Sequence, residues 1–403
     1  MGQSSNDLVQ CMKRLKDRIL NGDNLEKPFE DLVDLCIGRY GLNSHVWEAD
    51  LSRLCETHSF LMSEINKLTI TESELYEKDS LRQTMSFKEF AGNGYHNKAH
   101  QRITPLNKDS KYVFVGDVHS DPICIYKLLS DINFVKNYGN QNAIHLVFTG
   151  DYVDRGKNHL ETLSAILLLK YLFTDQVTLL QGNHDGGRRL EDGTIELPYR
   201  LFEEEDQMDY FPLFCDALSN KNRSFSDDMT DKYLDFFSNL PVIASIVHND
   251  TCYLAVHGGI PRARLDLGKN EESFKSTSYF DHLNSLSDFT DGQIKDYLGV
   301  SVIFNMLWSD PDRNGEALKY DKKRFRFTEA QLHVFLERFG VDYIIRGHEA
   351  HEEGVVSYYG GLVYTNFASG PLSHGTDNDS TAYDFVKPHI LILSDQGLVP
   401  VQL

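Results

Sequence analysis

Aspartate, asparagine and histidine recur in five short clusters, and these residue types suit metal binding and acid–base chemistry. The clusters occupy residues 116–119, 150–156, 182–185, 257–259 and 346–348, and each contains glycine. Carboxylate, imidazole and amide groups suit Mn²⁺, iron or Zn²⁺, and the lack of cysteine in the clusters argues against a structural zinc site. Glycine lets the backbone turn sharply and leaves room for a ligand. The sequence therefore predicts a site for divalent or transition metal ions.

Each cluster follows, directly or after one residue, a short apolar run that is typical of a buried strand. Such runs lie at residues 112–115, 144–148, 177–180, 242–247, 253–256 and 343–345, and amphipathic stretches at 122–131, 159–173, 229–239 and 328–339 predict helices. This alternation predicts an α/β domain with a largely buried sheet, whose functional groups gather where the strands end. A single cluster of this kind is usually only a turn or a surface ion pair. Five in order, each after a predicted strand, favour a functional site.

The region before these clusters has a different pattern. Apolar residues repeat at helical spacing within 8–19, 29–36 and 51–61, and the run from Thr71 to Glu74 resembles a capping box that would begin a further helix. Periodicity is absent from about residue 90 to 109. We therefore expect a helical N-terminal region with a linker at 1–108, followed by a catalytic domain at 109–403. The N-terminal helices are a candidate surface for a protein partner.

Composition limits the partners and the compartment that we expect. The chain has 403 residues and a formal net charge of −20, which disfavours nucleic acid as a partner. The beginning of the chain does not resemble a signal peptide, and no run of about 18 apolar residues predicts a transmembrane segment. The six cysteines lie far apart without a CxxC pair, which favours reduced thiols and a reducing compartment such as the cytoplasm.

The clusters resemble the motifs of the phosphoprotein phosphatase family of calcineurin-like metallophosphoesterases, which read GDxHG, GDxVDRG, GNHE, HGG and Arg-x-His. Residues 114–117, 149–156 and 181–184 follow that pattern closely, and 307–312 resembles a segment typical of serine/threonine phosphatases. The similarity covers about residues 110–370. It implies a β-sandwich of two mixed sheets flanked by helices, preceded here by the N-terminal helical region.

Departures from the family pattern bear on the substrate more than on the chemistry. Ser120 stands where the first motif usually has glycine, and Asp185 replaces the glutamate of the third. The stretch from Asn183 to His257 is longer than expected and contains the acidic run 203–206. Residues 367–370 lack the Pro-Asn-Tyr that usually follows in close eukaryotic relatives.

The resemblance implies a site with two metal ions, each held by residues of the five clusters. One ion would be bound by Asp117 and His119, the second by Asn183, His257 and His348, and both by the bridging Asp151. A hydroxide shared by the two ions would attack phosphorus in line with the ester oxygen. Manganese is the metal expected to support activity in vitro, with iron or zinc as alternatives.

The resemblance also implies roles for residues that do not bind metal. His184 would protonate the leaving group, and Asp154 would hold that imidazole in its protonated form. Arg155 would bind phosphoryl oxygens together with Asn183. A second arginine is expected from residues 323–326. Arg324 is predicted there, with Arg326 left open.

The function that follows is dephosphorylation of phosphoserine or phosphothreonine in proteins, with phosphotyrosine as a close variant. A different class is a small-molecule phosphoester hydrolase, such as one that cleaves dinucleoside polyphosphates. A third class is a non-catalytic adaptor that binds partners through the N-terminal helices. The complete set of candidate metal ligands favours an enzyme over the adaptor.

Overall fold

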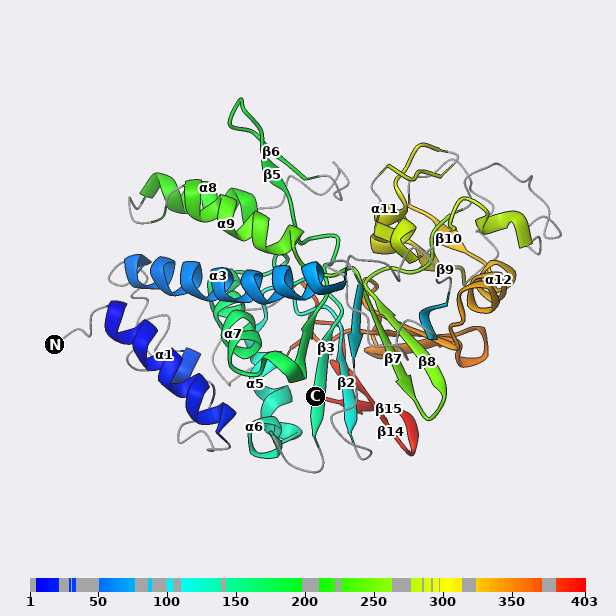
Figure 1. Cartoon of the computed structure of the whole chain (residues 1–403), viewed down its shortest axis with the longest axis horizontal. Coiled ribbons are helices and arrows are strands. Elements are labelled where there is room, and N and C mark those ends of the chain that lie inside the picture. The colour runs from blue at the N-terminus through cyan, green and yellow to red at the C-terminus, as the bar shows by residue number, and fades with distance from the viewer. Residues whose placement is uncertain are drawn as a thin grey trace.

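A computed structural model describes most of the chain, and the core of the described part is a sandwich of two mixed sheets with helices outside (Figure 1). The structure describes residues 5–21, 29, 31–33, 51–76, 86–88, 100–103, 110–138, 143–197, 210–221, 225, 227–262, 277–284, 286–290, 293–296, 298–313, 324–371 and 382–403.

The first sheet contains five strands within these ranges, in the order β15-β14-β2-β3-β4. Its strands are β2 (Lys111–Val115), β3 (Ile144–Phe148), β4 (Val177–Leu179), β14 (His389–Ser394) and β15 (Gly397–Gln402). The first three pair in parallel, whereas β14 runs antiparallel to both β2 and β15. Strand β3 is buried along its whole length, as its continuous apolar run predicts.

The second sheet has the order β1-β7-β8-β11-β13-β12 among the described strands. Its members are β1 (His100–Ile103), β7 (Ile243–His248), β8 (Thr251–Val256), β11 (Tyr343–Arg346), β12 (Val355–Tyr358) and β13 (Val363–Asn366). Strand β1 lies in the region that the sequence predicted to be an irregular linker, and it pairs in parallel with β7. Two small ribbons join β5 (Arg188–Arg189) to β6 (Ile195–Glu196), and β9 (Asp310–Pro311) to β10 (Arg326–Phe327).

The inner faces of the two large sheets share one apolar core. Tyr112 and Phe114 of β2 pack with Ala244 of β7, Ala255 of β8 and Ile345 of β11 in a single buried cluster. Contact between side chains of both sheets defines a sandwich, so the predicted fold class is confirmed.

Helices cover the two outer faces, as Figure 1 shows. On the first sheet lie α5 (Pro122–Asp131), α6 (Phe134–Asn137) and α7 (His159–Leu172), and on the second lie α11 (Val302–Trp308) and α12 (Glu329–Phe339). Helices α8 (Phe211–Lys221) and α9 (Asp227–Ser238) pack against each other, and α9 packs against the helix Leu51–Tyr76. Short 3₁₀ turns occupy Thr174–Gln176, Thr277–Phe280, Leu286–Thr290 and Tyr359–Gly361. The sequence dictates several of these boundaries. Asp121 caps α5 by accepting the N–H groups of Ile123 and Cys124, and Thr328 forms a capping box with Gln331 at the start of α12.

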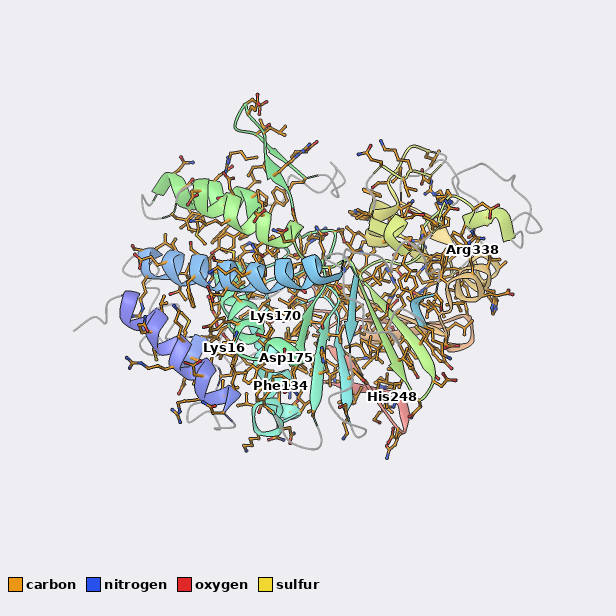
Figure 2. The ribbon with its side chains drawn as sticks, in the orientation of Figure 1. Lys16, Phe134, Lys170, Asp175, His248 and Arg338 are labelled. Atoms are coloured by element: carbon orange, nitrogen blue, oxygen red, sulfur yellow. The ribbon has the colours of Figure 1, made fainter. Side chains whose placement is uncertain are left out.

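The N-terminal helices α1 (Ser5–Leu20) and α3 (Leu51–Tyr76) pack against the same core as α7. His58 of α3 lies 2.7 Å from both the Tyr233 hydroxyl of α9 and the Ser164 hydroxyl of α7. Lys16 of α1, labelled in Figure 2, lies over the ring of Tyr171 at 4.4 Å. The helical character of this region is therefore confirmed for α1 and α3. The predicted helix start at Thr71 is wrong, because α3 continues through it.

Other sequence expectations have mixed outcomes. Cys11 is exposed, and Cys55, Cys124, Cys215 and Cys252 are buried free thiols; Cys36 and the acidic run 203–206 lie outside the described residues. No helix in the described ranges combines the length and apolar character needed to cross a bilayer. The boundary between residues 108 and 109 stays a prediction.

Candidate metal and phosphate site

The predicted site residues follow the ends of five strands that come from both large sheets. These residues are Asp117 and His119 after β2, Asp151, Asp154 and Arg155 after β3, Asn183 and His184 after β4, His257 after β8, and His348 after β11. Their side chains lie close together and are almost all buried. The strand ends therefore meet at one edge of the sandwich, as the sequence pattern indicated.

The first group of donor atoms comes from Asp117, His119 and Asp151. His119 Nε2 lies 3.5 Å from Asp117 Oδ2 and 3.5 Å from Asp151 Oδ2. The other ring nitrogen, Nδ1, donates to the Val153 carbonyl at 2.9 Å, which turns the Nε2 lone pair toward the two carboxylates. Asp117 Oδ2 is buried and has no hydrogen-bond partner in the part of the chain that the structure describes. An orphaned carboxylate oxygen of this kind fits a bound cation.

The second group converges on Asn183 Oδ1. This oxygen lies 2.7 Å from His257 Nε2 and 2.8 Å from His348 Nδ1. His257 Nε2 is also 3.3 Å from Asp151 Oδ2, so the Asp151 carboxylate belongs to both groups. His257 Nδ1 donates to the Thr149 carbonyl at 3.0 Å. The two groups therefore share one carboxylate, which is the arrangement required to bridge two ions.

Electrostatics favour bound positive charge at this cluster. Burial alone would raise the pKa of Asp151, but His257 and His184 outweigh it and hold that pKa well below its usual range. Burial, followed by the charge of Arg324, holds the pKa of His348 well below 6.5. Asp151 is thus ionised and His348 neutral near neutral pH, the forms in which both bind metal. Burial would lower the pKa of His257, yet the Asp151 carboxylate raises this pKa overall. The pKa of His257 is raised because the carboxylate attracts positive charge at this position. The donor set therefore fits metal ions.

His184 forms a short contact with Asp154 beside the shared carboxylate. His184 Nδ1 lies 2.6 Å from Asp154 Oδ2, and His184 Nε2 lies 3.9 Å from Asp151 Oδ2. Asp154 Oδ1 accepts the backbone N–H of Phe211 at 2.6 Å. His184 also comes close enough to share an ion with His119 and Asp151, although its distance to Asp151 exceeds the 3.5 Å of His119. His184 therefore lies within reach of both the Asp154 carboxylate and an ion beside Asp151.

The structure separates the two candidate arginines. Arg324 Nε donates to Asp310 Oδ2 at 2.6 Å, and its guanidinium lies 5.5 Å from the ring centre of Trp308. The Trp308 ring meets the ring of His348 edge to face at 5.0 Å, which brings Arg324 beside the second donor group. Arg326 instead lies in β10, where its backbone pairs with β9. Arg155 is held through its backbone, because its carbonyl accepts the N–H of Ala382 at 3.1 Å.

Two neighbours of the site carry roles that the sequence did not predict. Asp185 accepts three backbone N–H groups, from Asp151 at 2.7 Å, Gly182 at 2.9 Å and Tyr152 at 3.1 Å. Tyr383 stacks on the ring of His119 at 5.2 Å between ring centres. The replacement of glutamate at position 185 was a visible signal. Tyr383 had none, because it follows no motif and lies between β13 and β14.

Several site residues adopt left-handed backbone conformations that non-glycine residues rarely adopt. They are His119, Ser120, Asp151, Asp154, Arg155 and His348, with φ between 36° and 74°. Such conformations persist only where surrounding contacts hold them, and they concentrate at functional sites. Glycine is required at position 182, because a Cβ atom there would collide with the carboxylate of Asp151.

A pair of donor groups that share one aspartate, at the edge of a two-sheet sandwich, fits the metallophosphoesterase class that the sequence motifs resemble. The sequence profile of calcineurin-like phosphoesterases matches residues 110–352, more than half of the chain, and the chain belongs to this family.

Named relatives place the chain near protein phosphatases. It is 27% identical over 273 residues to a "probable serine/threonine-protein phosphatase" of Encephalitozoon cuniculi, and 27% identical over 271 residues to a "putative serine/threonine-protein phosphatase" of Caenorhabditis elegans. These matches cover 67% and 66% of this chain but only 49% of each relative, so the chain spans about half the length of these proteins.

A solved structure shows the same fold. It is a protein serine/threonine phosphatase from Saccharomyces cerevisiae, described as similar to human phosphatase PP5, and it matches with a TM-score of 0.54 and 18% identity. The match covers 87% of this chain and 89% of the yeast chain. At this identity the match bears on the fold alone.

Proposed function

We propose that this protein is a metal-dependent phosphatase that removes phosphate from phosphoserine and phosphothreonine in proteins. The observation that carries the proposal is the Asp151 carboxylate, which two convergent groups of metal donors share beside the His184–Asp154 pair. The names of the relatives support protein as the substrate.

Two metal ions would be held by the predicted ligands. Asp117 and His119 would hold one ion, Asn183, His257 and His348 the other, and Asp151 both. When bound, the ions would lower the pKa of water enough to supply a nucleophile near neutral pH, and they would neutralise phosphate charge. We propose manganese as the metal that supports activity in vitro, with iron or zinc as alternatives, because Asp, Asn and His donors suit all three.

The remaining residues act on the leaving group and on the phosphoryl oxygens. Protonated His184 donates a proton from Nε2 to the departing serine or threonine oxygen, and Asp154 stabilises the cation through the 2.6 Å contact at Nδ1. Arg155 and Arg324 stabilise the negative charge on the phosphoryl oxygens as the ester bond breaks. Asn183 orients the phosphate through its side-chain amide, whose Nδ2 is buried without a hydrogen-bond partner in the described part of the chain.

The preferred sequence around the phosphorylated residue would be basic. The acidic run 203–206 ends shortly before Phe211, and the backbone N–H of Phe211 donates to Asp154 at 2.6 Å. This bond holds Phe211 beside the catalytic pair. The negative charge of the acidic run would then favour substrates with lysine or arginine beside the phosphate.

The other parts of the proposal concern the whole protein. We propose residues 109–403 as the catalytic unit, supported by a family match that begins at residue 110. The helices α1 and α3 bury one side against this unit, so a protein partner would contact their outward side. Buried free thiols support a reducing compartment such as the cytoplasm.

Phosphate release from matched phosphoserine, phosphothreonine and phosphotyrosine peptides in the presence of Mn²⁺ tests the proposal. We expect turnover of the first two, and a loss of about 10²–10⁴-fold in kcat for His184→Ala. Asp151→Asn, whose folding is checked by circular dichroism, is the control that tests whether turnover depends on the shared metal-binding carboxylate. Diadenosine tetraphosphate is the comparison substrate. Its hydrolysis without any peptide turnover would refute a protein substrate.

A further inference from the structure

A buried hydrogen bond between Ser120 and His159 lies next to the catalytic pair. Ser120 Oγ is 2.7 Å from His159 Nδ1, and both side chains are almost completely buried. Ser120 follows the candidate ligand His119, and His159 is the first residue of α7. The bond therefore joins the loop after β2 to the helix that follows the loop after β3.

A second contact to the same nitrogen fixes the tautomer of His159. The backbone N–H of Asp154 points at His159 Nδ1 at 3.3 Å, and a backbone N–H can only donate. His159 Nδ1 is therefore an acceptor without a proton, and the Ser120 hydroxyl must donate to it. The His159 ring is held from the other side by Phe214 and Phe211, at 4.9 Å and 5.4 Å between ring centres.

These contacts converge on Asp154, whose backbone has a left-handed φ of 69°. The N–H of Asp154 donates to His159 Nδ1, and its Oδ1 accepts the N–H of Phe211. Its Oδ2 contacts His184 Nδ1. A strained conformation of this kind needs contacts on several sides to persist. Without the acceptor at His159, Asp154 would lose one of the contacts that aim its carboxylate at His184.

We propose that Ser120 and His159 are positioning residues that orient Asp154, and through it the proton donor His184. The Ser120 hydroxyl fixes the rotation of the His159 ring, and the ring fixes the turn at Asp154. Glycine, the usual residue of the family at position 120, has no hydroxyl and cannot make this bond. The inference rests on the proposed function for its kinetic consequence, but its structural consequence can be measured separately.

Two substrates that differ in leaving group separate proton donation from general damage. A phosphothreonine peptide has a poor leaving group that needs a proton, whereas p-nitrophenyl phosphate releases a stabilised phenolate that needs little proton transfer. We expect Ser120→Ala and His159→Leu to lower kcat on the peptide by about tenfold, a part of the general-acid contribution, with less than about twofold change on p-nitrophenyl phosphate. KM for both substrates should stay within about twofold.

His159→Asn is the matched control, because its Oδ1 can replace Nδ1 as the acceptor. It should recover most of the activity that His159→Leu loses on the peptide. Equal losses on both substrates, no loss on either, or no rescue by asparagine would each overturn the inference. Melting temperatures recorded for all three variants separate these outcomes from simple unfolding.

A proton NMR measurement tests the same inference without turnover. The 2.6 Å contact between His184 Nδ1 and Asp154 Oδ2 should give a strongly downfield proton signal, identified by its loss in His184→Ala. Ser120→Ala should shift or broaden this signal, and an unchanged signal would overturn the inference. Absence of activity in the parent protein would refute the proposed function, whereas this signal still decides the role of Ser120.

Discussion

Removing the carboxylate of Asp185 should destabilise the protein more than most single substitutions do. Its two oxygens accept three backbone N–H groups, and Asp185 is almost completely buried. A buried donor left without a partner costs about 1–3 kcal/mol. Asp185→Ala leaves three such donors without a partner, and water that enters the space would satisfy some of them. We therefore expect Asp185→Ala to lower the free energy of unfolding by about 3–6 kcal/mol.

The asparagine variant distinguishes this reasoning from a general effect of mutation. Asp185 Oδ2 accepts from Asp151 and Gly182, and Oδ1 accepts from Tyr152. Asp185→Asn keeps one oxygen, which can serve the first two donors, and places an amide against the third. We therefore expect Asp185→Asn to cost only about 1–3 kcal/mol.

Urea unfolding at neutral pH, with and without Mn²⁺, measures these differences. The exposed residue Glu191 provides a surface control, because Glu191→Ala should stay within about 0.5 kcal/mol of the parent. An alanine effect below about 1 kcal/mol would refute the count of unsatisfied donors. Equal destabilisation by Asp185→Ala and Asp185→Asn would also refute it. Because Asp151 is one of the three donors, Asp185→Ala should also weaken Mn²⁺ binding by about 10–100-fold, measurable by calorimetry.

Three further predictions concern pH, an aromatic contact and the metal ions. Burial lowers the pKa of His58 to about 3 from 6.5, so the unfolded chain binds a proton that the folded chain does not; stability should therefore fall as pH drops below about 6.5. His58 contributes a slope of up to about 1.4 kcal/mol per pH unit, which His58→Gln should remove in urea titrations between about pH 5 and 7. Tyr383→Leu removes the stacking on His119 and should weaken Mn²⁺ binding about tenfold by calorimetry, whereas unchanged affinity would show that the stacking does not orient this ligand. Chelation should abolish phosphate release and lower stability by about 2.7 kcal/mol relative to protein with metal at 100 times its Kd, and added Mn²⁺ should restore both.

The strands and helices that surround the site could be predicted because their residues obey simple periodicities. The run at 144–148 matches β3, and the stretch at 122–131 matches α5. Strand β1 was missed, because His100–Ile103 is short and mostly polar, and it is a strand only through its pairing with β7. Strand β15 contains Pro400, which weakens a strand pattern and is tolerated because β15 lies at the edge of its sheet.

The site residues that lie within recognisable sequence motifs could be predicted from the sequence. The glycine-flanked clusters supplied the candidate metal donors, from Asp117 to His348, and the His184–Asp154 pair. The sequence predicted Arg324 but left Arg326 open, because the packing of Arg324 over Trp308 is not visible in the residue pattern. Nor could the sequence reveal Tyr383, whose contact with His119 joins segments far apart in the chain.

The left-handed residues around the site have an evolutionary consequence. His119, Asp151 and His348 keep backbone conformations that glycine would adopt without strain, and only their side chains explain their presence. In a descendant that no longer needs catalysis, replacing them with glycine would relieve this backbone strain. Glycine at these three positions would therefore be a sign, readable from sequence alone, that a homologous chain has become a non-catalytic scaffold.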